Sequence, residues 1–141
     1  MSYSILIVDD SLPMRSVIKK TIKAAGFGQS EFLEAANGKE ALDQLKNNWV
    51  DLILTDYNMP VMNGLEFVKA VKARDLFKDI PVVVVSTEGN QARIREFKDC
   101  GASGYLTKPF AAEAVRDLIV NCLGEVDDEE QIDDSNEGLD F

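Results

Sequence analysis

The sequence predicts an α/β fold in which a parallel sheet of five strands is covered by helices on both faces. Two observations support this prediction. Short apolar runs alternate five times with longer segments of helical spacing, which is the pattern of repeated right-handed strand–helix–strand units. Three of these runs, at 5–8, 52–54 and 82–85, are apolar without interruption, as expected for strands that are buried on both faces of a parallel sheet.

The strand predictions follow directly from these runs and from two weaker ones. The predicted strands cover 4–8, 31–35, 51–55, 81–86 and 104–107. The second of them, EFLEA, is more polar than the others, so we place it at an edge of the sheet.

The segment after each strand has apolar residues three or four positions apart, which is typical of a helix packed on a sheet. In the first helix Ser11 can act as the N-cap with Pro13 in the first turn, and Gly26 ends the helix. Asn37 and Glu40 have the spacing of a capping box for the second helix. The other helices are predicted at about 64–74, around 94–97 and over about 115–122.

Length and composition indicate one soluble domain. The chain has 141 residues, 45% of them hydrophobic and 28% charged, which is enough to form a hydrophobic core. No apolar run reaches the roughly 20 residues of a membrane helix, and the start MSYSILIVDD lacks the features of a signal peptide. We therefore expect a cytoplasmic protein in which Cys100 and Cys122 are reduced thiols.

The charge is concentrated at one end of the chain. Residues 124–141 contain nine acidic residues and no basic one, and they account for nearly all of the net charge of −10. We divide the chain into a domain at 1–123 and an acidic tail at 124–141, which is too polar to fold alone. The tail is interpreted as a disordered solubilising extension, as a partner-binding segment, or as a segment that folds back on 87–122. An acidic chain without a basic arm argues against nucleic-acid binding.

Several charged and hydroxyl side chains follow the predicted strands. Because the carboxyl ends of parallel strands share one edge of the sheet, where ligands of open α/β sheets bind, these side chains should converge. They are Asp9 and Asp10 after the first strand, Asp56 after the third, Ser86 and Thr87 after the fourth, and Lys108 after the fifth.

The chemistry of this set favours a divalent cation and phosphoryl transfer. The three carboxylates carry −3, which Lys108 and one divalent cation would balance. The chain has no histidine, and sites built only from oxygen ligands favour Mg²⁺ over zinc. Because Mg²⁺ keeps several water ligands, it leaves room for a phosphoryl oxygen, and an aspartate can attack phosphorus to form an acyl phosphate.

Four segments, taken together and in order, carry a family resemblance. LIVDD, LTDYNMPVMNG, VVVVST and GYLTKPF resemble the receiver domain of two-component response regulators, and the similarity covers residues 4 to about 122. The resemblance implies a flavodoxin-like three-layer α/β/α sandwich with five helices and the strand order 2-1-3-4-5.

The resemblance also implies a role for each residue of the metal site. Asp56 would be the phospho-acceptor, and it would bind Mg²⁺ together with Asp9, Asp10 and the backbone carbonyl of Asn58. Lys108 would reach the phosphoryl group.

Two further residues match the conformational switch of the family. Ser86 corresponds to the switch hydroxyl, with Thr87 as the alternative, and Tyr105 corresponds to the switch aromatic residue. The peptide bond between Lys108 and Pro109 corresponds to one that is cis in the family.

The function that follows is a phosphorylation-dependent signalling switch. The chain would accept a phosphoryl group from a histidine kinase and would act as a monomer by binding a protein target on its 87–122 face. It would catalyse only its own phosphorylation and dephosphorylation. DDSLPMR resembles the chemotaxis subgroup, whose targets include flagellar switch proteins and phosphatases.

Three alternatives stay open. The chain could be a phosphorelay intermediate or regulator outside chemotaxis, or an adaptor that works without phosphorylation. An aspartyl phosphatase of the haloacid dehalogenase type is disfavoured, because that family places a second Asp where this chain has Asn58.

Overall fold

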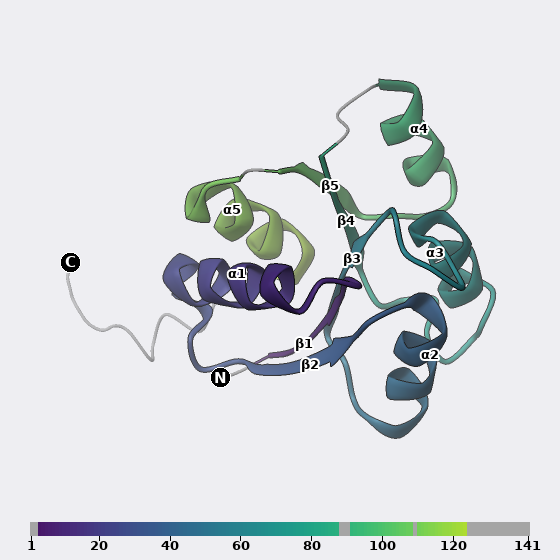
Figure 1. Cartoon of the computed structure of the whole chain (residues 1–141), viewed down its shortest axis with the longest axis horizontal. Coiled ribbons are helices and arrows are strands. Elements are labelled where there is room, and N and C mark those ends of the chain that lie inside the picture. Colours follow the sequence, from purple (N-terminus) through teal and green to yellow (C-terminus); the bar gives the residue numbers. More distant parts are fainter. Residues whose placement is uncertain (1–2, 88–90, 109, 124–141) are drawn as a thin grey trace.

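A computed structural model describes residues 3–87, 91–108 and 110–123 of the chain. Within these residues it has one sheet of five parallel strands in the order β2-β1-β3-β4-β5 (Figure 1). The strands are β1 (Ser4–Val8), β2 (Glu31–Ala35), β3 (Leu52–Asp56), β4 (Val82–Ser86) and β5 (Gly104–Thr107). The fold class, the strand order and the edge position of the polar second strand are confirmed.

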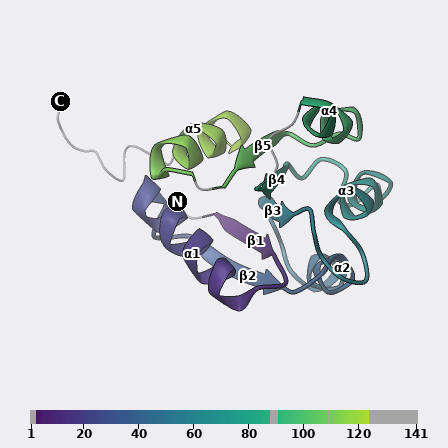
Figure 2. The same cartoon turned by 45° about the horizontal axis from the view of Figure 1, so that its top comes forward.

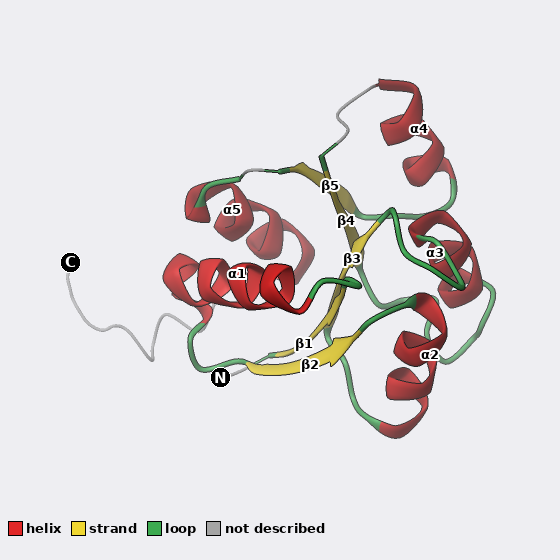
Figure 3. Cartoon of the chain, in the orientation of Figure 1, coloured by secondary structure: helices red, strands yellow, loops and turns green. Residues whose placement is uncertain are grey.

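The helices cover both faces of the sheet and complete a three-layer sandwich. They are α1 (Leu12–Ile22), continued by the π-helical turn η1 (Lys23–Phe27), then α2 (Gly38–Asn47), α3 (Gly64–Lys72), α4 (Gln91–Asp99) and α5 (Ala112–Leu123). Helices α1 and α5 lie on one face, and α2, α3 and α4 lie on the other (Figure 3).

The hydrophobic core consists of two layers, one on each face of the sheet. Successive side chains of a strand point to opposite faces, so Leu6 packs under α2 and α3 whereas Ile7 packs under α1 and α5. The inner strand β4, between β3 and β5, is buried throughout, which explains its unbroken valine run.

The two ends of the first helix were predicted with different success. Ser11 accepts a hydrogen bond from the Met14 amide at 3.2 Å and caps α1 as predicted. Gly26 has a φ of 108°, so it supplies the left-handed conformation in which the helix ends. The π-helical turn η1, which contains Gly26, was not predicted, because the sequence shows only that the regular spacing stops.

The predicted capping box of α2 is only half formed. The Asn37 side chain accepts from the Glu40 amide at 2.9 Å, but Glu40 accepts from the amide of Ala36 rather than that of Asn37. A reciprocal box is present instead at α3, between Asn63 and Glu66.

None of the helices in the described part of the chain has the length and apolar character needed to span a bilayer. Pro109, with its predicted cis bond, and the segment 124–141 lie outside the described residues.

Candidate functional site

Three carboxylates from two strands meet at the carboxyl edge of the sheet. Asp9 and Asp10 follow β1, and Asp56 is the last residue of the neighbouring strand β3. One carboxylate oxygen from each lies within 4.8 Å of the others. The arrowheads of the strands gather along this edge in Figure 2. The predicted convergence of the three acids is therefore present.

Asp9 is the most constrained of the three acids. Its backbone amide donates to the carbonyl of Ala35 at 3.0 Å, and its Oδ1 accepts from the amide of Ser11 at 2.9 Å. Its own carbonyl accepts from Nη1 of Arg15 at 2.5 Å. Asp9 is only 2% exposed, so the β1–α1 loop holds a charged side chain in a fixed position at the edge of the core.

Lys108 bridges the two strands that carry the acids. Its Nζ lies 3.4 Å from Oδ2 of Asp9 and 3.6 Å from Oδ1 of Asp56. The Lys108 amide donates to the carbonyl of Ser86 at 2.7 Å, which links the β5 end to the β4 end. The predicted lysine thus contacts both carboxylates, and the predicted serine lies on the strand beside it.

The ionisation of Asp56 is opposed by its surroundings. Burial, together with the charge of Asp9, raises the pKa of Asp56 above its ordinary value of 3.8, although Lys108 and the Tyr57 amide act in the opposite direction. The side chain of Asp56 is 14% exposed. The charge of one lysine therefore does not fully offset the burial and mutual repulsion of the clustered carboxylates. A bound cation would reduce this unfavourable electrostatic energy.

We expect Asp56→Asn to stabilise the metal-free chain at neutral pH. Because the pKa of Asp56 is raised in the folded state, the folded chain binds this proton more tightly than the unfolded chain. Wild-type stability should fall as pH rises above 3.8 through the raised pKa. Asn carries no charge, so the variant should gain on the order of 1 kcal/mol at pH 7, and this gain should disappear toward pH 4.

Urea unfolding in EDTA across this pH range would measure the difference. The exposed pair Asp43 and Lys46, 4.0 Å apart on α2, provides the control, and Asp43→Asn should change stability little. A loss of stability in Asp56→Asn at pH 7 would contradict the expectation.

An ion-pair network that the sequence did not reveal supports the β1–α1 loop. Nε of Arg15 and Nζ of Lys19 each lie 2.8 Å from a carboxylate oxygen of Glu34 on β2. These two ion pairs lower the pKa of Glu34. Because Arg15 also holds the carbonyl of Asp9, the network positions a site residue. The feature of the sequence that could have predicted this network is the spacing of Arg15 and Lys19, which lie one helical turn apart.

A chain of rings leads from Asp56 toward β5. The ring of Tyr57 meets Phe97 edge to face at a centroid distance of 5.6 Å, and Phe97 lies 5.9 Å from Tyr105. The guanidinium of Arg93 stacks 3.9 Å from the Tyr57 ring centroid. The predicted switch residue Tyr105 is therefore connected by packing to the residue next to Asp56. The connection runs through Phe97, which the sequence predicts only as an apolar residue of the fourth helix.

The remaining predicted residues differ in their surroundings. Asn58 is exposed in the loop after β3, and Thr87 is exposed whereas Ser86 is 1% exposed. Val61, in the same loop as Asn58, has a φ of 71°, which is unusual for a β-branched residue. The buried position of Ser86 favours it over Thr87 as the hydroxyl that belongs to the site.

The donor set fits a hard divalent cation. The clustered atoms are all carboxylate oxygens, which is the ligand type that Mg²⁺ prefers. Asp9 and Asp56 are oriented by backbone amides, as metal-binding carboxylates usually are.

Comparisons with known proteins identify the family of the chain. The response regulator receiver domain matches residues 5–120. A chemotaxis protein CheY homolog of Campylobacter jejuni is 41% identical over 121 residues, which is 85% of this chain and 92% of that protein.

Solved structures show the same fold. The chemotaxis response regulator CheY4 of Vibrio cholerae matches with a TM-score of 0.77 and 37% identity, covering 87% of this chain and all of that one. The receiver domain of the sensor histidine kinase PA1611 of Pseudomonas aeruginosa has a magnesium ion coordinated in its active site cleft. It matches with a TM-score of 0.77 at 22% identity, covering 89% of this chain and all of that one, a likeness that concerns the fold. The chain belongs to the response regulator receiver family and is of the CheY chemotaxis type.

Proposed function

We propose that the chain accepts a phosphoryl group on Asp56 from a histidine kinase and signals by binding another protein. The observation that carries the proposal is the meeting of Asp9, Asp10 and Asp56 within 4.8 Å, with Lys108 within 3.6 Å of two of them. A stable structural site would pair its charges, whereas this one leaves an excess of negative charge around a carboxylate.

The proposed cofactor is Mg²⁺, held by the carboxylates of Asp9, Asp10 and Asp56 and by the backbone carbonyl of Asn58. When bound, the ion would neutralise negative charge on the transferred phosphoryl group. The excess negative charge of the cluster supports this assignment, because a divalent cation and Lys108 together balance three carboxylates.

In the proposed reaction the free Asp56 oxygen attacks the phosphorus of a phosphohistidine. An O–P bond forms as the P–N bond breaks, and the bonding electrons stay on the nitrogen of the imidazole that leaves, which takes up a proton from water. The other oxygen of Asp56 accepts from the Tyr57 amide at 2.9 Å, which orients the carboxylate. Lys108 and Ser86 would donate to the phosphoryl oxygens.

The proposed output is a change in the face formed by 87–122. A phosphoryl group brings additional negative charge and new acceptor oxygens to Asp56. Ser86 would move toward it, and Tyr105 would turn into the space that Ser86 leaves, a shift between two packings of the same chain. The ring contacts from Tyr57 through Phe97 to Tyr105 support this coupling.

The pathway that we propose is chemotaxis. The partners would be a histidine kinase and a flagellar switch protein or a phosphatase, and the chain would act in the cytoplasm as a monomer. Similarity to CheY proteins over most of the chain supports chemotaxis over other phosphorelays.

Labelling with acetyl phosphate tests the proposal without a kinase. Intact-mass spectrometry should detect one phosphoryl group on wild type in Mg²⁺ and less than about one hundredth of that signal after EDTA, a loss typical of removing an essential metal. Asp56→Asn should give none, whereas Asp51→Asn, which changes a carboxylate at the opposite edge, should label normally. Unchanged labelling of Asp56→Asn would refute the assignment of the acceptor.

A further inference from the structure

We propose that the acidic segment 124–141 binds the α1 helix of its own chain. The surface that we assign to it, called the α1 surface below, consists of the exposed residues Lys20 and Lys23 and of the adjacent apolar groove that contains Met14 and Val17. The inference does not depend on phosphorylation.

The α1 surface is basic without compensating acids. Residues 12–27 contain four basic residues and no acidic one. Two of the four, Arg15 and Lys19, pair with Glu34 at 2.8 Å. Lys20 and Lys23 are exposed and form no ion pair with any residue of the described ranges. Lys23 instead lies 5.8 Å from the ring centroid of Phe32.

The segment has the complementary charge. Residues 124–141 contain nine acidic residues and no basic one, with Ile132, Leu139 and Phe141 among them. The 87–122 face is less suitable, because it has five acidic and five basic residues. Near-balanced faces give little attraction to an acidic segment, whereas a surface of one sign attracts it over its whole length.

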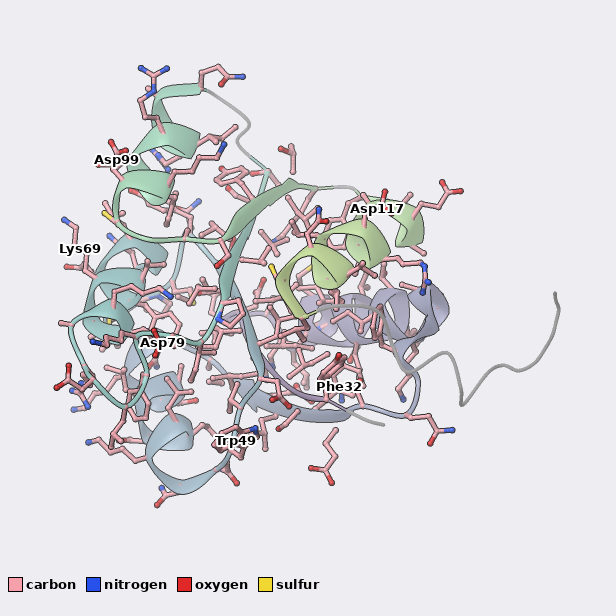
Figure 4. All side chains as sticks on the ribbon, turned by 180° about the vertical axis from the view of Figure 1, so that it is seen from behind. Phe32, Trp49, Lys69, Asp79, Asp99 and Asp117 are labelled. Carbon is pink, nitrogen blue, oxygen red and sulfur yellow. The ribbon has the colours of Figure 1, made fainter. Side chains whose placement is uncertain are left out.

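The segment also begins beside α1. The carbonyl of Leu123, the last residue of α5, accepts from the Tyr3 hydroxyl at 3.2 Å, and the Tyr3 ring lies 6.4 Å from that of Phe27 in η1. Nη1 of Arg116 donates to the carbonyl of Ala25 at 3.4 Å. The chain therefore leaves the described structure next to η1, the turn that continues α1 and begins with Lys23. Figure 4 shows Phe32 and Asp117 on the α1 and α5 side of the sheet.

The segment is long enough to follow the helix to the site. Residues 12–27 span about 24 Å at the helical rise, whereas 124–141 can reach up to roughly 60 Å. At the far end lies a groove of about 320 Å³, lined by Met14, Val17, Thr21, Thr87, Lys108 and Phe110. It offers a place for the apolar residues of the segment after its acids have passed Lys23 and Lys20.

A spin label on the segment tests this placement directly. The label would be attached at Asn136→Cys in full-length chain carrying Cys100→Ala and Cys122→Ala, and amide spectra would show which residues it broadens. Broadening should concentrate on residues 14–23 and weaken in Lys20→Gln/Lys23→Gln. The matched control, Lys39→Gln/Lys46→Gln on α2, removes the same charge and should keep the broadening.

Digestion with the protease Glu-C provides a second measurement in chain that retains both cysteines. Cleavage within 124–141 should be about threefold faster in Lys20→Gln/Lys23→Gln than in wild type, the change expected when two exposed ion pairs are lost, and unchanged in the α2 control. Broadening centred on α4 and β5 would overturn the proposal, because the segment would then bind a different face. Broadening that appears only between labelled and unlabelled chains in a mixture would also overturn it, because the segment would then bind another copy of the chain. So would cleavage that is indifferent to Lys20 and Lys23.

Discussion

Replacing Asp9 with Asn should weaken Mg²⁺ binding at least about 100-fold, because it removes both a ligand and a charge from the cluster. Asp9 accepts from the Ser11 amide through Oδ1 and contacts Lys108 through Oδ2. An Asn side chain would keep the first contact with its oxygen, and so its NH₂ group would point at Lys108 and at the cation position. The variant would thus place a hydrogen-bond donor, the NH₂ group, where the ion needs an oxygen ligand.

Calorimetric titration with Mg²⁺ measures this effect, and the thermal shift on adding the ion gives a second readout. Wild type should be stabilised by millimolar Mg²⁺, whereas Asp9→Asn should not respond. Asp117→Asn, at an exposed position on α5, changes the same charge and should bind as wild type does. Wild-type affinity in the Asp9 variant would place the ion elsewhere.

The parts of the fold that were predicted are those that depend on burial. The strand at 82–86 was predicted because a strand that lies between two layers of helices must have apolar side chains on both of its faces. The second strand was predicted at an edge of the sheet because it contains the polar residues Glu31 and Glu34. The order of the three inner strands came from the family resemblance. The apolar sequences of the buried strands do not indicate which of these strands are neighbours in the sheet.

The site was predicted to the extent that the carboxyl edge of the sheet determines it. The topology alone brings together Asp9, Asp10, Asp56 and Lys108, because each lies at the end of a strand or soon after it. Contacts made by long side chains were not predicted, because their direction depends on the packing of neighbouring elements. The Arg15 contact with Asp9 and the stacking of Arg93 on Tyr57 are of this kind.

Gly64→Ala should lower the free energy of unfolding by about 3 kcal/mol, at the upper end for an overpacked position. A Cβ on Gly64 would overlap the carbonyl oxygen of Asp56 and would lie 2.9 Å from Cα of Tyr57. Both are backbone atoms, which cannot rotate away as a side chain does. The Gly64 amide also donates to the Tyr57 carbonyl at 2.8 Å, so relief of the overlap requires that the loop after β3 move away from α3.

Two other glycines separate this steric cause from the general effect of Gly→Ala. At Gly38 the three atoms nearest to the Cβ would all belong to the Met62 side chain, with Sδ at 2.7 Å, and at Gly28 the Cβ would meet nothing within 4 Å. Urea unfolding should therefore rank Gly64→Ala as far more destabilising than Gly38→Ala, with Gly28→Ala near neutral. Because the displaced loop directly follows Asp56, Gly64→Ala should also reduce labelling by acetyl phosphate. A variant that is destabilised but labels normally would show that α3, rather than the loop, yields to the added methyl group.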